Sequence, residues 1–235
     1  MLRRNDEGCS ATQKMNFLRS RQLIDMFITL EGIEGSGKTT QIKNIAEFLR
    51  SKGQDCIITR EPGGTKTGEK VRAILLDPGS KDMDPLTELL LYMADRSQHI
   101  KEFIYPSLSS GKTVLCDRYY DATVVYQGFA RGLDIRLINR LHELVFEDLK
   151  PNITILLDLP PEIGLSRAWE QIENGSRTAL ETRFEKETLS FHKKVRTGYL
   201  ELAKKEPLRF RIVDASNDEN QVKNDIIKIL SEKWI

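Results

Sequence analysis

The sequence has almost no excess charge, few cysteines and no long apolar run. Its 235 residues carry 36 Lys and Arg against 35 Asp and Glu, a net charge of +1, so bulk electrostatics does not favour a nucleic-acid or membrane partner. No apolar run approaches the roughly 20 residues of a membrane-spanning helix. Cys9, Cys56 and Cys116 lack metal-ligand spacing. They are interpreted as thiols of a reducing, cytoplasmic compartment.

Residues 1–25 differ from the rest of the chain. They mix basic and acidic side chains with weak periodicity, and they lack the apolar core of a secretory signal. We interpret them as a flexible or partly helical N-terminal tail that precedes the first strand.

From residue 26 onward, apolar strand-like runs alternate with amphipathic helical patterns. The predicted strands are 26–31, 55–59, 113–117, 153–158 and 210–214. The predicted helices are 38–52, 68–77, 84–104, 134–149, 183–205 and 218–233. Ser216 and Glu219 suggest a capping box for the last helix. This alternation is typical of an α/β fold in which helices cover both faces of a parallel sheet.

The most informative segment is GIEGSGKTT, between the first predicted strand and the helix that follows. Glycines let backbone N–H groups turn inward around a phosphate, and the helix N-terminus adds its positive end. A lysine and a threonine then supply a cation for the outer phosphates and a Mg²⁺ ligand. The predicted nucleotide-binding residues are Gly32, Ile33, Glu34, Gly35, Ser36, Gly37, Lys38, Thr39 and Thr40.

A phosphate-binding loop by itself fits a kinase, a GTPase, a motor or a transporter ATPase. The chain has no NKxD guanine-reading segment, which argues against a GTPase. Residues 108–112 only faintly resemble the LSGGQ-like signature of transporter ATPases, and we interpret that segment as a helix-ending turn. A nucleotide kinase and a nucleotide-dependent switch remain. The two are separated by whether ADP release requires an acceptor.

A small-molecule kinase needs carboxylates near Mg²⁺, cations for the acceptor and a cationic lid. The predicted strand 113–117 ends in Asp117, and Arg118 follows it, at the edge where ligands bind in such sheets. Asp158 is equally compatible with a place near the nucleotide and with a helix cap. Arginines at 167, 177 and 183 lie in and around the stretch 173–182, which shows no helix or strand pattern. Each alone fits a solvated helix surface, but as a group they suggest a phosphate-closing lid over about 167–183.

With these residues in hand, the chain resembles bacterial thymidylate kinase over residues 26–235. The resemblance rests on the loop together with TREPGGT at 59–65, GEKVRAILLD at 68–77, ELLLYMADRSQH at 88–99 and DRYYDATVVYQG at 117–128. It implies a three-layer P-loop kinase fold with strand order 2-3-1-4-5 and ATP-dependent phosphorylation of dTMP to dTDP. It also implies Mg²⁺ and a homodimer packed through helices.

The resemblance also implies roles for individual residues. Lys38, Asp117 and Arg118 match catalytic positions, and Thr39 with Asp117 matches the metal site. Tyr92 stands where a phenylalanine usually stacks on thymine, and Ala122 replaces a common serine. The substrate-binding positions are Glu34, Arg60, Glu61, Tyr92, Arg96, Arg118, Thr123 and Gln127.

Gly35 occupies a loop position where some members carry a catalytic arginine, so the resemblance implies that the lid supplies this charge. Arg167 is expected on the ATP side, and Arg177 and Arg183 remain alternative catalytic candidates. No general base is expected, because a phosphate acceptor is already ionised at neutral pH. His99 and His142 are therefore interpreted as structural, and His192 is expected at the surface.

Overall fold

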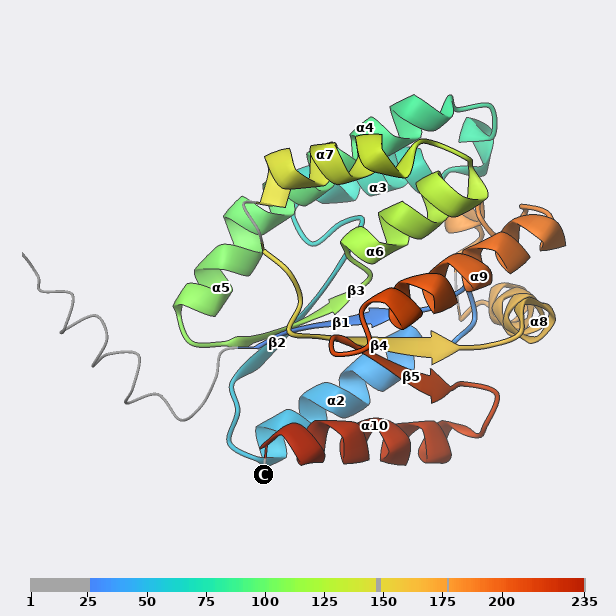
Figure 1. The fold of residues 1–235 in the computed structure, drawn as a ribbon. Coiled ribbons are helices and arrows are strands. Elements are labelled where there is room, and N and C mark those ends of the chain that lie inside the picture. The colour runs from blue at the N-terminus through green and yellow to red at the C-terminus, as the bar shows by residue number, and fades with distance from the viewer. Residues whose placement is uncertain (1–25, 147–148, 177, 235) are drawn as a thin grey trace, which may run out of the picture.

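The computed structural model describes residues 26–146, 149–176 and 178–234, and these form a five-stranded parallel sheet of order β2-β3-β1-β4-β5 (Figure 1). All four strand pairs are parallel. The predicted fold class, strands and strand order are thus confirmed. The predicted tail, 1–25, lies outside the described residues. The strands are β1 Phe27–Glu31, β2 Cys56–Arg60, β3 Thr113–Asp117, β4 Ile153–Asp158 and β5 Phe210–Asp214.

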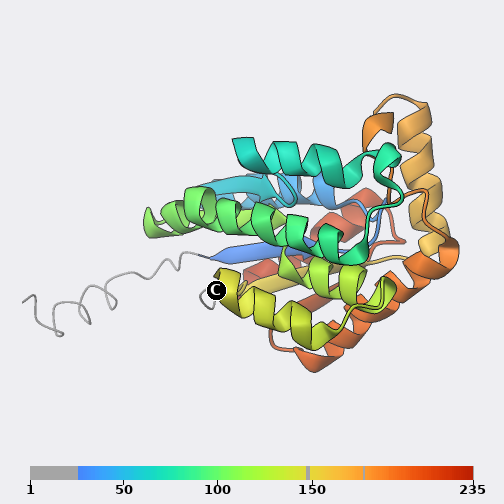
Figure 2. The ribbon, with the colours of Figure 1, turned by 90° about the horizontal axis from the view of Figure 1, so that it is seen from above.

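Helices cover both faces of the sheet, with α2 and α10 on one face and the others on the opposite face or at the strand ends (Figures 1 and 2). Two segments are π-helical, Ile100–Ile104 and Val124–Ala130. The α-helices are α2 Lys38–Ser51, α3 Lys66–Leu76, α4 Pro85–His99, α5 Tyr105–Ser109, α6 Tyr120–Thr123, α7 Ile135–Phe146, α8 Pro161–Glu173, α9 Leu189–Lys205 and α10 Glu219–Trp234.

The core lies on the central strands. Every residue of β1 is buried, and the apolar stripe of α2, formed by Ile42, Ile45 and Leu49, packs beneath it. A strand buried on both faces must be nearly continuous in apolar residues. That property made the strands recognisable in the sequence. Parallel pairing of β1 with β3 places their C-terminal ends side by side.

Several helical segments differ from the prediction. Residues 120–130 and 161–173 are helical although neither was predicted so, and α9 begins at Leu189 rather than 183. The predicted capping box is wrong, because Asp218 accepts hydrogen bonds from the backbone N–H groups of Asn220 and Gln221. Ser216 instead donates to Asp214.

Helix α8 approaches the phosphate loop backbone to backbone. A Cβ added at Gly35 would lie 2.0 Å from the carbonyl oxygen of Gly164, and one at Gly164 would lie 2.5 Å from that of Glu34. Gly35 also has φ +70°, a conformation that costs little only for glycine. The loop and the start of α8 therefore fit together because both positions lack side chains.

Gly164→Ala should destabilise the protein by about 1–3 kcal/mol, because the added methyl overpacks a backbone contact. Urea denaturation of the variant and the parent chain measures this. Gly79→Ala is the matched control, since the nearest atoms to its Cβ would belong to the Asp77 side chain, at 3.2 Å and beyond, and not to backbone. Equal stability of the two variants would contradict this account of the contact.

Candidate functional site

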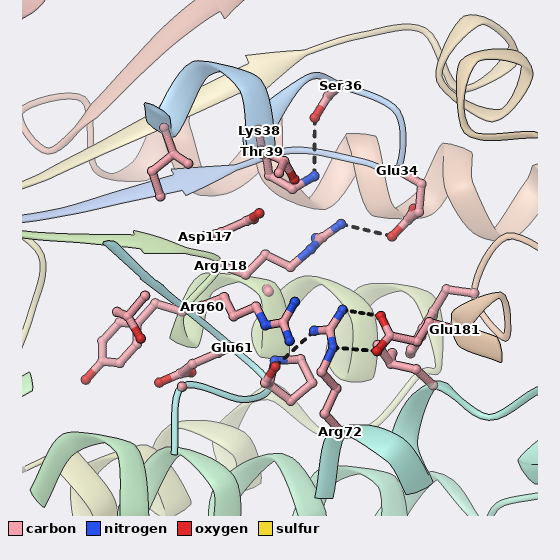
Figure 3. Close-up of a pocket in the computed structure, with 18 of the residues that line it drawn as sticks. Glu34, Ser36, Lys38, Thr39, Arg60, Glu61, Arg72, Asp117, Arg118 and Glu181 are labelled. Atoms are coloured by element: carbon pink, nitrogen blue, oxygen red, sulfur yellow. Dashed lines mark hydrogen bonds and ion pairs between the residues drawn. The ribbon is translucent and has the colours of Figure 1, made fainter. Parts of the chain in front are cut away.

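A cavity of about 550 Å³ opens at the C-terminal ends of β1 and β3, between the phosphate loop and α4 (Figure 3). One side is the loop, from Glu34 to Thr40, and the other is formed by α3, α4 and the α6 region. Parallel strands present their C-terminal ends to ligands at such an edge. Most of the predicted site residues meet here, including Arg60, Glu61, Tyr92, Arg96, Asp117, Arg118, Thr123 and Gln127.

Lys38 begins α2 and is folded back onto the loop. Its Nζ donates to the carbonyl oxygens of Gly32 at 3.1 Å and Ile33 at 2.8 Å, and to Ser36 Oγ at 3.3 Å. Burial, and after it the nearby charge of Arg118, lowers the pKa of Lys38 to about 8. An anion in the loop would offset that desolvation and favour the charged amine.

Arg118 is held in a strained backbone conformation by its neighbours. It is the one non-glycine with positive φ, +67°, among the described residues, which costs on the order of 1 kcal/mol. Its guanidinium donates to Glu34 Oε1 at 2.9 Å and to the Tyr199 hydroxyl at 3.1 Å. It also lies over the Tyr126 ring, 4.9 Å from the centroid. These contacts fix the cation beneath the loop.

Glu34 is the carboxylate on which these contacts converge. It is buried, and its Oε1 also accepts from the Tyr126 hydroxyl at 2.6 Å. Burial alone would raise the pKa of Glu34, but the charges of Arg118, His192 and Lys38 hold it well below its usual range. Glu34 is therefore ionised at neutral pH and pairs the loop with Arg118.

On the opposite wall, Arg96 is held in place by fixed partners. Its guanidinium pairs with Glu61 and donates to Thr123 Oγ1 at 2.8 Å and to the Tyr119 carbonyl at 3.0 Å. Glu61 also accepts from His99 Nδ1 at 2.9 Å. Glu61 was predicted as a substrate contact, and in this structure both of its oxygens hold other side chains.

Gln127 is oriented in the same way. Its Nε2 donates to Glu88 Oε1 at 2.7 Å, which fixes the orientation of its amide. Glu88, in turn, is fully buried and pairs with Arg183 and Arg131. Tyr92 lies on the same wall, and burial, followed by Glu88, raises the pKa of its hydroxyl above the ordinary value. The hydroxyl therefore stays neutral.

Two ion pairs lie at the opening of the cavity. Arg60 pairs with Glu69 at 3.0 Å, with both side chains about half exposed. Arg72 of α3 binds Glu181 through two hydrogen bonds, of 3.0 and 2.6 Å, and donates to the Pro62 carbonyl (Figure 3). Sequence reasoning did not select Arg72 or Glu181. Arg72 falls within the GEKVRAILLD segment, which was the available signal.

Thr39 and Asp117 are suited to a hard cation. Asp117 points from the end of β3 toward Lys38 and Thr39 (Figure 3), so a carboxylate and a hydroxyl lie beside the loop lysine. Among the described residues no group of three or more His, Cys, Asp or Glu could hold a metal. Mg²⁺ needs few protein ligands when phosphates and water complete its coordination shell.

The comparisons with known proteins agree with this geometry. A family model described as Thymidylate kinase matches residues 30–226. The chain belongs to the thymidylate kinase family. The thymidylate kinase of Desulfosudis oleivorans is 53% identical over 205 residues, 87% of this chain and 96% of that protein. That of Desulforapulum autotrophicum is 54% identical over 208 residues, 88% and 92% of the two chains.

A solved structure supports the same assignment. The crystal structure of thymidylate kinase from Ehrlichia chaffeensis has a TM-score of 0.69 and 36% identity, and it covers 87% of this chain and 98% of that one. The thymidylate kinase family phosphorylates dTMP. In the described part of the chain, no helix is long and apolar enough to cross a membrane.

The arginines of the predicted thymidylate kinase lid have different surroundings. Arg167 lies within α8 and donates to the carbonyl of Ala215 at 2.9 Å. Arg177 lies outside the described residues. Arg183 is 4% exposed and holds Glu88 and the Leu75 carbonyl, because the buried Glu88 carboxylate needs a counter-charge. This is not the exposed position expected of a mobile lid residue.

Two further residues differ from what was expected. Asp158 neither caps α8 nor lines the main cavity. It binds Arg196 through two hydrogen bonds, of 2.7 and 2.8 Å. His192 was expected at the surface, and that was wrong, because it is fully buried against Glu34. His99 and His142 are buried, as their structural interpretation requires.

Glu31, at the end of β1, is a buried carboxyl beneath the site. It accepts from the Tyr119 N–H at 2.8 Å and the Tyr199 hydroxyl at 2.7 Å. Burial, followed by the Asp121 charge, raises the pKa of Glu31 from 4.5 to about 8. The folded state thus holds this proton more tightly than the unfolded chain.

The free energy of unfolding should therefore fall as pH rises from about 4.5 to about 8. Glu31→Gln should flatten this dependence, because an amide does not titrate. Urea midpoints at pH 5, 6.5 and 8 measure it, with the exposed Glu162→Gln as a control. Parallel pH profiles for Glu31→Gln and the parent would contradict the assignment.

Proposed function

We propose that this protein transfers the γ-phosphate of ATP to dTMP, with Mg²⁺, and so forms dTDP for dTTP synthesis. The observation that supports this most is the Glu34–Arg118 pair. It places one fixed cation between the phosphate loop and the wall that carries Tyr92, Arg96 and Gln127. A phosphate donor and an aromatic, polar acceptor site would thus share a single cavity.

The acceptor base would stack on Tyr92, a flat apolar surface suited to a pyrimidine. Arg96, Thr123 and Gln127 would meet its polar edge. Each of these side chains is already held by a hydrogen bond within the protein, so little rotamer entropy would be lost on binding. Glu34 would face the sugar, as the family resemblance suggests.

The main barrier to the reaction is bringing two polyanions together. Lys38 would leave its loop carbonyls for the outer phosphates of ATP, and Arg118 would lie between the donor and acceptor phosphates. Fixed cations of this kind stabilise the charge of the transition state and orient the reactants for in-line transfer. Arg60, exposed at the opening, would add to the acceptor side. Arg167 would lie on the ATP side.

Thr39 and Asp117 would hold Mg²⁺, which neutralises phosphate charge when bound. Arg183 would serve the site through Glu88 and Gln127 rather than by contacting phosphate. This leaves Arg177 as the lid candidate for direct charge neutralisation.

We also propose a cytoplasmic homodimer packed through α4 and α7. Large apolar side chains are exposed there at helical spacing: Leu86 and Leu90 on α4, at 43% and 49%, and Leu137 and Leu144 on α7, at 40% and 79%. The two helices lie side by side (Figure 1). A clustered apolar surface of this kind is typical of an interface.

ATP binding at pH 8.5 should be accompanied by proton uptake, because phosphates favour the charged form of Lys38, whose pKa in the free protein is about 8. Calorimetry in two buffers of different ionisation enthalpy measures this uptake. Lys38→Arg is the control, since a guanidinium stays protonated at this pH. Binding heats that do not depend on the buffer in the parent protein would contradict the role of Lys38.

The substrate itself is tested by an ADP-release assay with dTMP, dUMP and dCMP. We expect dTMP to exceed dUMP by about 10–200-fold in kcat/KM, since one methyl group discriminates only weakly. Cytosine reverses the donor and acceptor at the base edge and leaves buried groups mismatched, so dCMP should fall by about 10⁴-fold or more. Comparable values for dTMP and dCMP would overturn the dTMP assignment.

A further inference from the structure

His192 is a fully buried histidine at the base of the site that the proposed mechanism does not use. It lies on α9, and its Nε2 is 3.1 Å from the carbonyl oxygen of Phe184. A carbonyl oxygen can only accept a hydrogen bond, so Nε2 carries a hydrogen. This fixes which nitrogen remains for the other side of the ring.

The other nitrogen, Nδ1, lies 3.2 Å from Glu34 Oε2. Both atoms are buried, and neither has another hydrogen-bond partner. Without a hydrogen on Nδ1, a nitrogen lone pair would face a carboxylate oxygen in a dry environment, which is repulsive. With a hydrogen, the same contact becomes a charge-assisted hydrogen bond and satisfies both atoms.

The shared proton belongs on the histidine rather than on Glu34. Arg118 and the Tyr126 hydroxyl both donate to Oε1 of Glu34, and such donors stabilise a carboxylate over a carboxylic acid. We propose that His192 is an imidazolium that fixes the second oxygen of Glu34 and so positions Glu34 and Arg118 for the acceptor phosphate. The kinetic part of this proposal rests on the proposed function.

The other charged groups around His192 have partners of their own. His192 faces Glu34 of the phosphate loop, and Lys38 also lies near that carboxylate. The Tyr126 hydroxyl, from the π-helical segment after α6, donates to the same carboxylate. Of the carboxylates on the other elements packed against α9, Glu162 of α8 pairs with Lys193, Asp158 of β4 with Arg196 and Asp121 of α6 with Arg209, and Asp214 of β5 accepts from Ser216. Among these, Glu34 is the carboxylate that His192 meets.

Two substitutions separate a positioning role from a packing role. In His192→Asn the side-chain amide lies near the place of Nδ1 and can still donate to Glu34. In His192→Gln it reaches the place of Nε2 and can still donate to Phe184. The proposal predicts that His192→Gln lowers kcat/KM for dTMP about tenfold, mainly through KM for dTMP, while the KM for ATP stays within about twofold.

His192→Asn should retain clearly more activity than His192→Gln. The reverse order, with His192→Gln near the parent and His192→Asn impaired, would show that the Phe184 contact matters and would overturn the proposal. Thermal denaturation of both variants separates loss of folding from loss of positioning. A loss of kcat/KM that simply follows the melting temperature would also overturn it.

The protonation state is measured without any substrate. The chain has three histidines, so ¹⁵N-imidazole labelling of the full chain gives few signals, and the His192→Gln spectrum assigns the one that disappears. At pH 7.5, His192 should show two protonated ring nitrogens, and in Glu34→Gln only one. A neutral His192 ring in the parent protein overturns the proposal whatever the substrate profile shows, whereas failure of dTMP turnover would leave this result standing.

Discussion

The ion pair between Glu34 and Arg118 joins the two halves of the site. Glu34 belongs to the phosphate loop after β1, and Arg118 to the turn after β3, and parallel pairing of these strands brings the two residues together. Arg118 has a left-handed backbone conformation, and Glu34, Tyr126 and Tyr199 hold its guanidinium. Strain of this kind persists where the surroundings determine the conformation. The pair therefore fixes the distance between the phosphate loop and the turn after β3, which leads into the opposite wall of the cavity.

On the opposite wall of the cavity, which carries Tyr92, Arg96 and Gln127, buried charges are likewise held in place by their partners. Arg96 is 1% exposed and Glu88 0%, and a buried ion stays tolerable only when its partners are all in place. Glu61, which also binds His99, holds Arg96, while Arg183 and Arg131 hold Glu88. These networks add little to stability compared with well-packed apolar groups. In the reaction we propose, their consequence would be specificity, because Thr123 and Gln127 could not turn to suit a different base edge.

Sequence reasoning recovered the parts of the molecule whose signal is local. Strands buried on both faces are continuous apolar runs, so β1, β3 and β4 were placed within one residue. The segment 120–130 was not recognised as helical, because its β-branched and aromatic residues lack helical periodicity and are buried on several sides. Helix α8 did carry a signal, Pro161 at its first position, but the lid interpretation of residues 167–183 did not use it.

The partners of buried polar side chains were beyond sequence reasoning. His192 lies 158 positions from Glu34 in sequence, and nothing local distinguishes it from a surface histidine on an amphipathic helix. Its burial depends on α9 packing against the π-helical segment after α6. Arg183 is a similar case. Its basic, loop-rich surroundings suggested a lid, but its guanidinium binds Glu88 of α4.

The contact between α8 and the phosphate loop restricts where catalytic charge can come from. A side chain at position 35 would begin 2.0 Å from the Gly164 carbonyl oxygen, far inside van der Waals contact. An arginine in the loop would therefore require α8 to move away, and the loop would lose the surface against which it packs. In the reaction we propose, charge built up on the transferring phosphoryl group must then be offset by Lys38, Arg118 and residues beyond α8. The same helix that excludes a loop arginine leads directly into the segment that would have to replace it.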